Sequence, residues 1–228
     1  MTVGRAGAAE WPARLPTVLR VEGRNTASLP QPFAAEDVRF TEQFVAFFVE
    51  RLTAPGDAVL DPFAGFGTTP IVAERMGREG WGVEIDAERV AYIRGRAAAP
   101  DRILEADARA LTTLAVPPIT LVVTSPPFSA PGDPLDALGG YRGRNPGYVA
   151  YLDGIRDVFR SARALLAPGA WVVIEAADLR RSDEVTQLPR DIAAAVGEVL
   201  PFAGEIAVEW EPPLRGDYDR SVCLLFSA

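Results

Sequence analysis

The sequence predicts an α/β fold, in which a mostly parallel sheet is covered by helices on both faces. Short apolar runs alternate along the chain with longer amphipathic segments, a pattern typical of buried parallel strands joined by helices. Polar residues follow several of these runs, at the sheet edge where ligands bind. The chain has 228 residues, 48% of them hydrophobic, which suffices for one large domain with a buried core.

The apolar runs predict seven strands, at residues 58–60, 80–83, 102–104, 119–124, 170–175, 205–210 and 220–226. Helical patterns occupy residues 44–52, 68–76, 87–96, 148–166 and 189–200, with a short one near 109–114. Residues 1–35 are rich in Ala, Pro, Gly and Arg and lack periodicity, so we expect an extended or partly disordered N-terminal arm there. One domain is then predicted over residues 36–228.

The composition excludes several classes of chemistry. The chain contains no His, which removes imidazole bases, Ser-His-Asp triads and His-ligated metals, and we predict no metal site. The single cysteine, Cys223, lies in an apolar run and is expected in the core. A net charge of −8 argues against a protein that holds nucleic acid over its whole surface. No apolar run is long enough to span a bilayer, so we expect a cytoplasmic protein.

A glycine-containing turn follows the first predicted strand. The stretch Asp61-Pro62-Phe63-Ala64-Gly65-Phe66-Gly67-Thr68-Thr69 lies between that strand and a helix that begins near Thr68. Gly65 and Gly67 allow a tight turn and a close approach of the backbone to a ligand, because neither has a Cβ. The same glycines are also compatible with an ordinary strand-to-helix turn.

Two carboxylates favour a ligand site over an ordinary turn. Glu84 ends the next strand, about 20 residues downstream, where a carboxylate can accept hydrogen bonds from both hydroxyls of a ribose. Asp61 places a negative charge at the strand tip, which repels a diphosphate and attracts a cation. Ile71 and Val72 occupy the region where a dinucleotide fingerprint has its third glycine. These features favour S-adenosylmethionine (SAM), whose ammonium and sulfonium groups are cationic, over NAD.

A second chemical motif, Thr124-Ser125-Pro126-Pro127-Phe128, ends the fourth predicted strand. Consecutive prolines fix φ and lack N–H groups, which leaves a rigid segment with outward carbonyl acceptors. Ser125 adds a hydroxyl, and Phe128 adds an apolar plane on which a flat ring can stack. The motif therefore suits an exocyclic ring amine whose two N–H groups are held by Ser125 Oγ and the Pro126 carbonyl. The other interpretation is an ordinary Pro-Pro loop.

Together, the two motifs resemble the SAM-binding and catalytic motifs of the amino-group DNA methyltransferases, which modify adenine N6 or cytosine N4. The Ser-Pro-Pro form is closest to the cytosine-N4 enzymes. The resemblance covers roughly residues 38–178 and implies a Rossmann-like SAM-dependent methyltransferase fold, with a mostly parallel seven-stranded sheet. It also implies SAM as the cofactor and DNA as the partner.

The resemblance assigns roles to residues of this chain. Asp61, Phe63, Gly65 and Gly67 would line the methionine and sulfonium, Glu84 the ribose, and Asp107 the adenine amino group. The full cofactor set is Phe40, Thr41, Asp61, Pro62, Phe63, Gly65, Gly67, Thr68, Glu84, Ile85, Asp107 and Ala108. The catalytic set, which would hold the target amine, is Ser125, Pro126, Pro127 and Phe128.

The chain departs from the family pattern in three ways. Phe128 replaces the usual Tyr and loses its hydroxyl, and the order of the motifs is permuted relative to many bacterial members. No segment is long enough for a separate target-recognition domain. The loop from Ser129 to Pro146 contains Tyr141, Arg142 and Arg144, an aromatic residue with two cations that can stack on a base and hold a phosphate. We expect these three residues to bind substrate, and the other interpretation is a mobile solvated lid.

Three functions are compatible with these residues. The first is methyl transfer to an exocyclic amine of DNA, with cytosine N4 favoured over adenine N6. The second is the same methyl transfer with RNA or a small amine-bearing metabolite as the substrate. The net negative charge of the chain and the lack of a target-recognition domain favour this function. The third is a non-catalytic SAM-binding subunit, against which the intact Ser125-Pro126-Pro127 argues. The sequence does not predict the oligomeric state.

Overall fold

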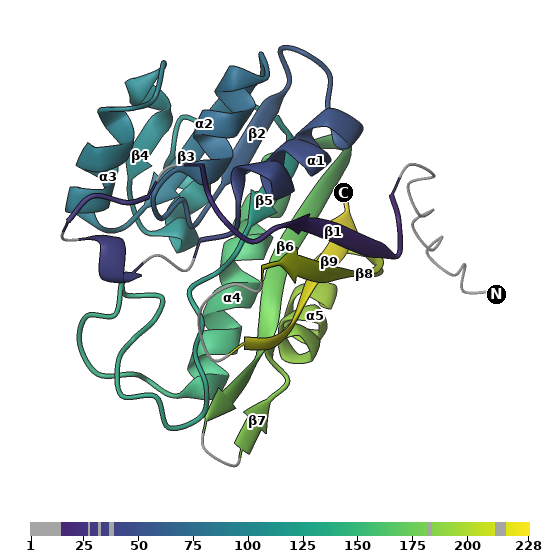
Figure 1. Cartoon of the computed structure of the whole chain (residues 1–228). Helices are drawn as coiled ribbons and strands as arrows, with labels where there is room; N and C mark the ends of the chain where they lie inside the picture. Colours follow the sequence, from purple (N-terminus) through teal and green to yellow (C-terminus); the bar gives the residue numbers. More distant parts are fainter. Residues whose placement is uncertain (1–14, 27, 32, 37–38, 182–183, 213–217) are drawn as a thin grey trace, which may run out of the picture.

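The computed structural model describes residues 15–228 apart from residues 27, 32, 37–38, 182–183 and 213–217. Its centre is one sheet with the strand order β1-β8-β9-β6-β5-β2-β3-β4, and β7 pairs with β6 off this path (Figure 1). Strands β2 to β6 run parallel, whereas β9 is antiparallel to both β6 and β8. The strands are β1 (Val18–Glu22), β2 (Ala58–Asp61), β3 (Glu79–Glu84), β4 (Ile103–Glu105), β5 (Ile119–Thr124), β6 (Leu166–Arg181), β7 (Glu184–Thr186), β8 (Phe202–Glu211) and β9 (Tyr218–Ser227).

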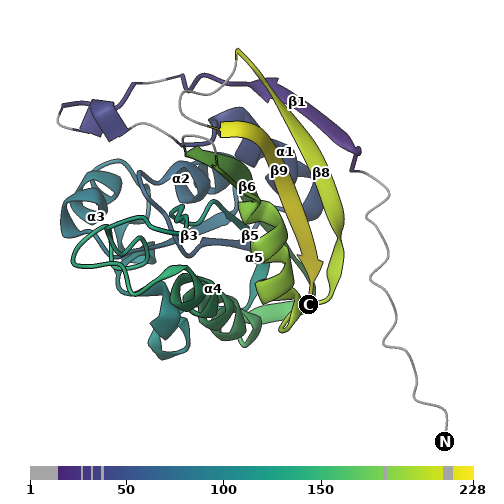
Figure 2. The same ribbon diagram turned by 90° about the horizontal axis from the view of Figure 1, so that it is seen from below.

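Helices cover both faces of the sheet, as Figure 2 shows. One face carries α1 (Glu42–Leu52), α2 (Thr68–Arg75) and α3 (Ala87–Arg94), and the other carries α4 (Tyr148–Arg163) and α5 (Leu188–Gly197). Short segments of 3-10 helix are η1 (Phe33–Glu36), η2 (Pro100–Arg102) and η3 (Ala108–Thr113). In β5, Val122 packs in the core under α4 and α5, while Leu121 and Val123 pack in the core under α1. Burial on both faces explains why this strand is a continuous apolar run in the sequence.

All seven predicted strands are present, and the structure adds β1 and β7. Strand β1 lies inside the segment predicted to be an N-terminal arm, and it pairs in parallel with β8. Leu19 and Val21 are buried on the sheet, so the sheet begins before residue 36. Residues 1–14 of the predicted arm lie outside the described residues.

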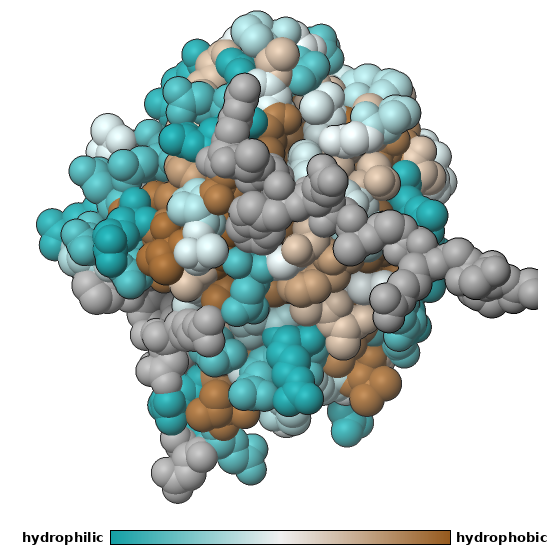
Figure 3. All heavy atoms as spheres, turned by 90° about the vertical axis from the view of Figure 1, so that its right-hand side faces the viewer, coloured by the Kyte–Doolittle hydropathy of each residue, from teal (hydrophilic) through white to brown (hydrophobic). Residues whose placement is uncertain are grey.

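The side of the molecule where β1 and β8 lie is shown in Figure 3. Among the residues drawn in colour, hydrophobic ones form several separate patches between hydrophilic ones. Val18 of β1 and Phe202 of β8 are among the exposed large hydrophobic residues. Within the part of the chain that the structure describes, no helix is long and apolar enough to cross a membrane.

The sheet brings the carboxyl ends of its central strands to one edge. The register of β2 on β3 pairs Asp61 with Gly82, and that of β5 on β6 pairs Thr124 with Ile174. The next polar side chains, Glu84 and Ser125, therefore lie at neighbouring strand ends, and Glu175 lies beside them within the longer strand β6. This edge is the place where open α/β sheets bind ligands.

Candidate active site

The turn after β2 is shaped by its glycines. Gly65 and Gly67 have φ of +55° and +81°, a region that residues with a side chain rarely adopt. A Cβ on Gly67 would also lie 2.6 Å from a methyl carbon of Ile93, so the turn packs tightly on α3. The Ala64 N–H donates to the Val83 carbonyl at 2.9 Å, which fastens the turn to β3. The backbone of residues 63–67 is thereby held at the mouth of a pocket.

Glu84 sits beneath this turn and supports it. Its Oε2 accepts a hydrogen bond from Gly65 N at 2.8 Å, and its Oε1 accepts one from Asp86 N at 2.9 Å. Each oxygen keeps a further lone pair, and the side chain lines the pocket. Burial raises the pKa of Glu84, an effect that the backbone hydrogen bonds from Asp86 and Gly65 oppose. Two acceptor oxygens facing a pocket suit a ligand with a pair of hydroxyls.

Asp61 is almost fully buried at the end of β2. Its Oδ1 accepts hydrogen bonds from the Thr124 hydroxyl at 2.6 Å and from Phe63 N at 3.0 Å. Burial raises the pKa of Asp61 to about 6, although these hydrogen bonds lower it. The bond from Thr124 joins the turn after β2 to the residue that precedes Ser125. The two motifs found in the sequence are therefore in direct contact.

We expect the affinity for a cationic ligand to depend on this carboxyl. Asp61 is ionised above its pKa of about 6 and becomes neutral below it, so the attraction for the cation is lost as the pH falls through that value. One pH unit below the pKa, about one tenth of the carboxyl is ionised, and SAM should bind roughly tenfold more weakly. Calorimetric titration with SAM between pH 5 and 8 measures this. The dependence should shrink in Asp61→Asn and persist in Asp101→Asn, and an unchanged dependence in Asp61→Asn would contradict the role.

Asp107, at the far end of the same pocket, has a guanidinium partner. Arg109 Nε lies 2.9 Å from Asp107 Oδ1, and Arg109 Nη2 lies 2.5 Å from Oδ2. Burial raises the pKa of Asp107, but the hydrogen bonds and charge of Arg109 outweigh it, so the net shift is downward. Asp107 also caps η3 by accepting from Arg109 N. The carboxylate predicted to hold an adenine amino group thus also holds Arg109.

Ser125, after β5, is backed by a buried acid that the sequence analysis did not identify. The Ser221 hydroxyl donates a hydrogen bond to Glu175 of β6, and the Ser125 hydroxyl lies close enough to Glu175 to help lower its pKa. Burial raises the pKa of Glu175, while the two serine hydroxyls lower it in part. The signal in the sequence that could have identified Glu175 is its position as the one acidic residue in the apolar run 170–177. Ser125 therefore has a proton acceptor on the side away from the pocket.

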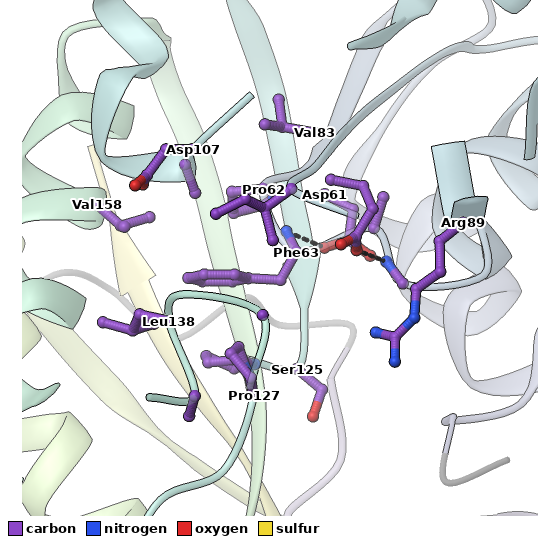
Figure 4. A pocket seen from close by; sticks show the side chains of 18 of the residues that line it. Asp61, Pro62, Phe63, Val83, Arg89, Asp107, Ser125, Pro127, Leu138 and Val158 are labelled. Atoms are coloured by element: carbon purple, nitrogen blue, oxygen red, sulfur yellow. Dashed lines mark hydrogen bonds between the residues drawn. The ribbon is translucent and has the colours of Figure 1, made fainter. Parts of the chain in front are cut away.

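One cavity of about 210 Å³ contains both motifs (Figure 4). Asp61, Phe63 and Ser125 surround it, and Asp107 and Arg89 lie on opposite sides. All four predicted catalytic residues line it. The predicted cofactor residues that line it are Phe40, Asp61, Pro62, Phe63, Gly65, Thr68, Glu84, Ile85, Asp107 and Ala108. The other two predicted cofactor residues, Thr41 and Gly67, do not line it; they are the N-cap residues of α1 and α2.

The loop 129–147 covers one side of this cavity. Tyr141 lines the cavity, and its hydroxyl donates to the Phe128 carbonyl at 3.2 Å. Arg142 pairs with Asp86, with 2.7 Å between Nη2 and Oδ2. Arg144 is exposed and is not among the lining residues. Of the three residues predicted to bind substrate, the structure brings Tyr141 alone to the cavity wall.

Known proteins resemble the cofactor half of this site. Residues 15–95 match a family model described as DNA methylase. The type II methyltransferase M.BglII of Bacillus subtilis is 42% identical over 59 residues, which are 24% of this chain and 16% of that protein. The type II methyltransferase M.PvuII of Proteus hauseri is 42% identical over 57 residues, which are 25% of this chain and 17% of that protein. Residues 15–95 are therefore similar to the DNA methylase family and to segments of type II methyltransferases.

The matched region has clear limits. These alignments span only 16% and 17% of the two curated relatives. The family segment includes Asp61 and Glu84 and ends before Ser125. The resemblance of the Ser-Pro-Pro motif to this family therefore rests on its own residues and on its position beside Asp61.

Solved structures identify the fold. TrmN from Thermus thermophilus has a TM-score of 0.58 at 22% identity, over 82% of this chain and 48% of that chain. A TehB-like SAM-dependent methyltransferase from Corynebacterium glutamicum has a TM-score of 0.56 at 14% identity, over 85% of this chain and 91% of that chain. Identities this low show the fold alone. That fold is the Rossmann-like SAM-dependent methyltransferase fold, as predicted.

SAM is the cofactor of this family and fold, and the residues of the pocket fit it. Glu84 offers two oxygens to ribose hydroxyls, and Asp61 offers a negative charge to a cation. Phe63 and Ile85 add apolar surface to the pocket. The left-handed Gly65 lets the backbone approach the ligand without a Cβ.

Proposed function

We propose that the chain is a SAM-dependent methyltransferase that acts on an exocyclic amine of a DNA base, with cytosine N4 as the target. The observation that carries the proposal is the single pocket joining Asp61 and Glu84 to Ser125 and Phe128. The similarity of residues 15–95 to the DNA methylase family supports DNA as the substrate. The Ser-Pro-Pro form of the second motif supports cytosine N4 over adenine N6.

In this proposal the chain holds and orients the amine. SAM, when bound, supplies a methyl group on a positively charged sulfur. Phe128 stacks on the target ring. Ser125 Oγ and the Pro126 carbonyl each accept one N–H of the amine, which favours a tetrahedral nitrogen with its lone pair directed at the methyl group. A base in a duplex first leaves the stack, at a cost of a few kcal/mol.

Ser125 and Glu175 also provide a route for the proton. As the nitrogen–carbon bond forms and the sulfur–carbon bond breaks, the amine nitrogen becomes positively charged. Ser125 Oγ accepts the surplus proton and passes its own proton to Glu175. Burial raises the pKa of Glu175, so its carboxylate accepts a proton more readily than an exposed one would. No His is needed for this transfer.

Replacing Glu175 by glutamine tests that route. We expect Glu175→Gln to lower kcat by roughly 10- to 100-fold, because a hydrogen bond to a charged group contributes about 1.5–3 kcal/mol. SAM affinity should not change, since Glu175 is absent from the pocket lining. Single-turnover transfer and SAM titration measure the two effects. The exposed Glu198→Gln is the matched control, and a wild-type kcat in Glu175→Gln would exclude the proton route.

The function itself is tested by transfer of labelled methyl from SAM to unmethylated DNA, with total RNA in a parallel reaction. Nucleoside mass analysis then identifies the product, and Ser125→Ala is the control. We expect N4-methylcytosine in DNA that disappears in the control. N6-methyladenine would change the target base, and label in RNA alone would favour the second function. SAM binding without any transfer to polymers or small amines would favour a non-catalytic subunit.

A further inference from the structure

The loop 129–147 is a folded element with its own contacts. Leu135 and Arg144 form an antiparallel bridge across it, and Asn145 Nδ2 donates to the Asp133 carbonyl at 2.8 Å. Leu138 is buried against α4, where a Cβ on Gly154 would lie 2.4 Å from its side chain. The loop is therefore held at both its base and its middle.

Residues 140–142, which we call the bridging segment, contact both halves of the pocket. Gly140 packs on Ile85 of the cofactor half so closely that a Cβ would lie 3.1 Å from Ile85 Cγ2. Arg142 reaches the same half through its ion pair with Asp86. Tyr141, between them, donates its hydroxyl to the carbonyl of Phe128 in the target half. Three consecutive residues thus contact both the cofactor half and the target half.

The backbone at the centre of this segment is constrained. Tyr141 has a φ of +58°, and no other non-glycine residue in the described ranges has a positive φ. An aromatic residue rarely adopts this conformation, which persists where surrounding contacts enforce it. Its N–H donates to the Asp136 carbonyl at 2.7 Å. The left-handed turn directs the side chain of Tyr141 to the Phe128 carbonyl and that of Arg142 to Asp86.

Asp86 connects the segment to the predicted ribose site. Its Oδ1 caps α3 by accepting from Glu88 N and Arg89 N, while its Oδ2 accepts from Arg142. The backbone N–H of Asp86 donates to Glu84 Oε1. A continuous set of hydrogen bonds therefore runs from Arg142 through Asp86 to Glu84.

We infer that the bridging segment couples cofactor binding to placement of the target ring, with Tyr141 and Arg142 as positioning residues. This inference rests on the proposed function. A nucleoside bound against Glu84 and Ile85 holds Asp86 and Gly140 in place. Because Arg142 pairs with Asp86, the bridging segment is then held as well. Tyr141 then fixes the Phe128 carbonyl and the ring that stacks on the target. Arg142 acts on the cofactor half through Asp86, in place of the phosphate contact expected from the sequence.

The first test is hydrogen exchange of residues 129–147 with and without sinefungin, a SAM analogue without a transferable methyl group. We expect the analogue to slow exchange in the wild type and in Arg160→Gln, an exposed control on α4. The slowing should be lost or reduced in Arg142→Gln and partly restored in Arg142→Lys. Equal slowing in Arg142→Gln would overturn the inference. The experiment needs no methylatable substrate, so its outcome is independent of the proposed reaction.

The second test separates the roles kinetically. Tyr141→Phe keeps the ring and removes the hydroxyl, so it should lower kcat severalfold with the KM for SAM unchanged. Arg142→Gln should raise the KM for SAM about two- to fivefold, the range of an exposed ion pair. If the segment couples the halves, the effects in the double variant will be non-additive. Additive effects would overturn the coupling, whereas absence of transfer in every variant and the wild type would overturn the proposed function instead.

Discussion

Replacing Ser125 by alanine is expected to lower kcat for methyl transfer by on the order of 10²- to 10³-fold. Ser125 lines the pocket, and its hydroxyl interacts with Glu175. Alanine removes the acceptor for one amine N–H and interrupts the proton route in one change. Asp61 and Glu84 are untouched, so the dissociation constant for SAM should stay at its wild-type value.

Single-turnover transfer and calorimetric SAM binding measure these two quantities separately. Ser227→Ala is a suitable control, because Ser227 is the last residue of β9, six residues after Ser221, and does not line the pocket. Ser125→Thr keeps the hydroxyl and should retain part of the activity. Wild-type transfer by Ser125→Ala would show that the hydroxyl takes no part in the reaction. A loss of SAM binding in the same variant would instead place Ser125 in the cofactor half.

The elements that follow local periodicity were predictable from the sequence. Strand β5 is apolar at nearly every position because both of its faces are buried, and this pattern needs no knowledge of its partners. Strand β1 was missed because its five residues alternate exposed and buried between Pro16 and Gly23. So short an alternation becomes a strand only through pairing with β8, some 190 residues further along the chain. Strand β7 has three residues and pairs with β6 alone.

The candidate site was predictable to the extent that its residues stand at strand ends. Asp61, Glu84 and Ser125 follow apolar runs, and parallel pairing brings such ends together. Glu175 was missed because its partner Ser221 comes from an antiparallel strand 46 residues away. The pairing of Arg142 with Asp86, 56 residues apart, depends on the path of a loop without periodicity. Local sequence pattern therefore predicts which candidate residues lie at the strand ends, but not the contacts between residues far apart in the chain.

Replacing Glu84 by glutamine is expected to weaken SAM binding by roughly 100-fold. Each hydrogen bond to a charged group contributes about 1.5–3 kcal/mol, and the loss of about 3 kcal/mol from the ribose hydroxyls corresponds to that factor. Glutamine keeps the shape of the side chain but has a single acceptor oxygen. It can retain the bond from either Gly65 N or Asp86 N, and its amide group then faces the other N–H.

The melting temperature of Glu84→Gln shows whether a loss of SAM affinity arises from the lost hydrogen bonds or from unfolding. Burial raises the pKa of Glu84, which means that the ionised carboxylate is less stable in the folded protein than in the unfolded chain. Above that pKa the wild-type protein therefore loses some folding stability through this charge. The neutral side chain of glutamine does not carry the charge and avoids that loss. We therefore expect the melting temperature of Glu84→Gln to stay near that of the wild type while affinity falls. Glu79→Gln, at the start of the same strand, is the matched control. If Glu84→Gln binds SAM with wild-type affinity, the hydrogen bonds from the ribose hydroxyls to Glu84 do not contribute to binding.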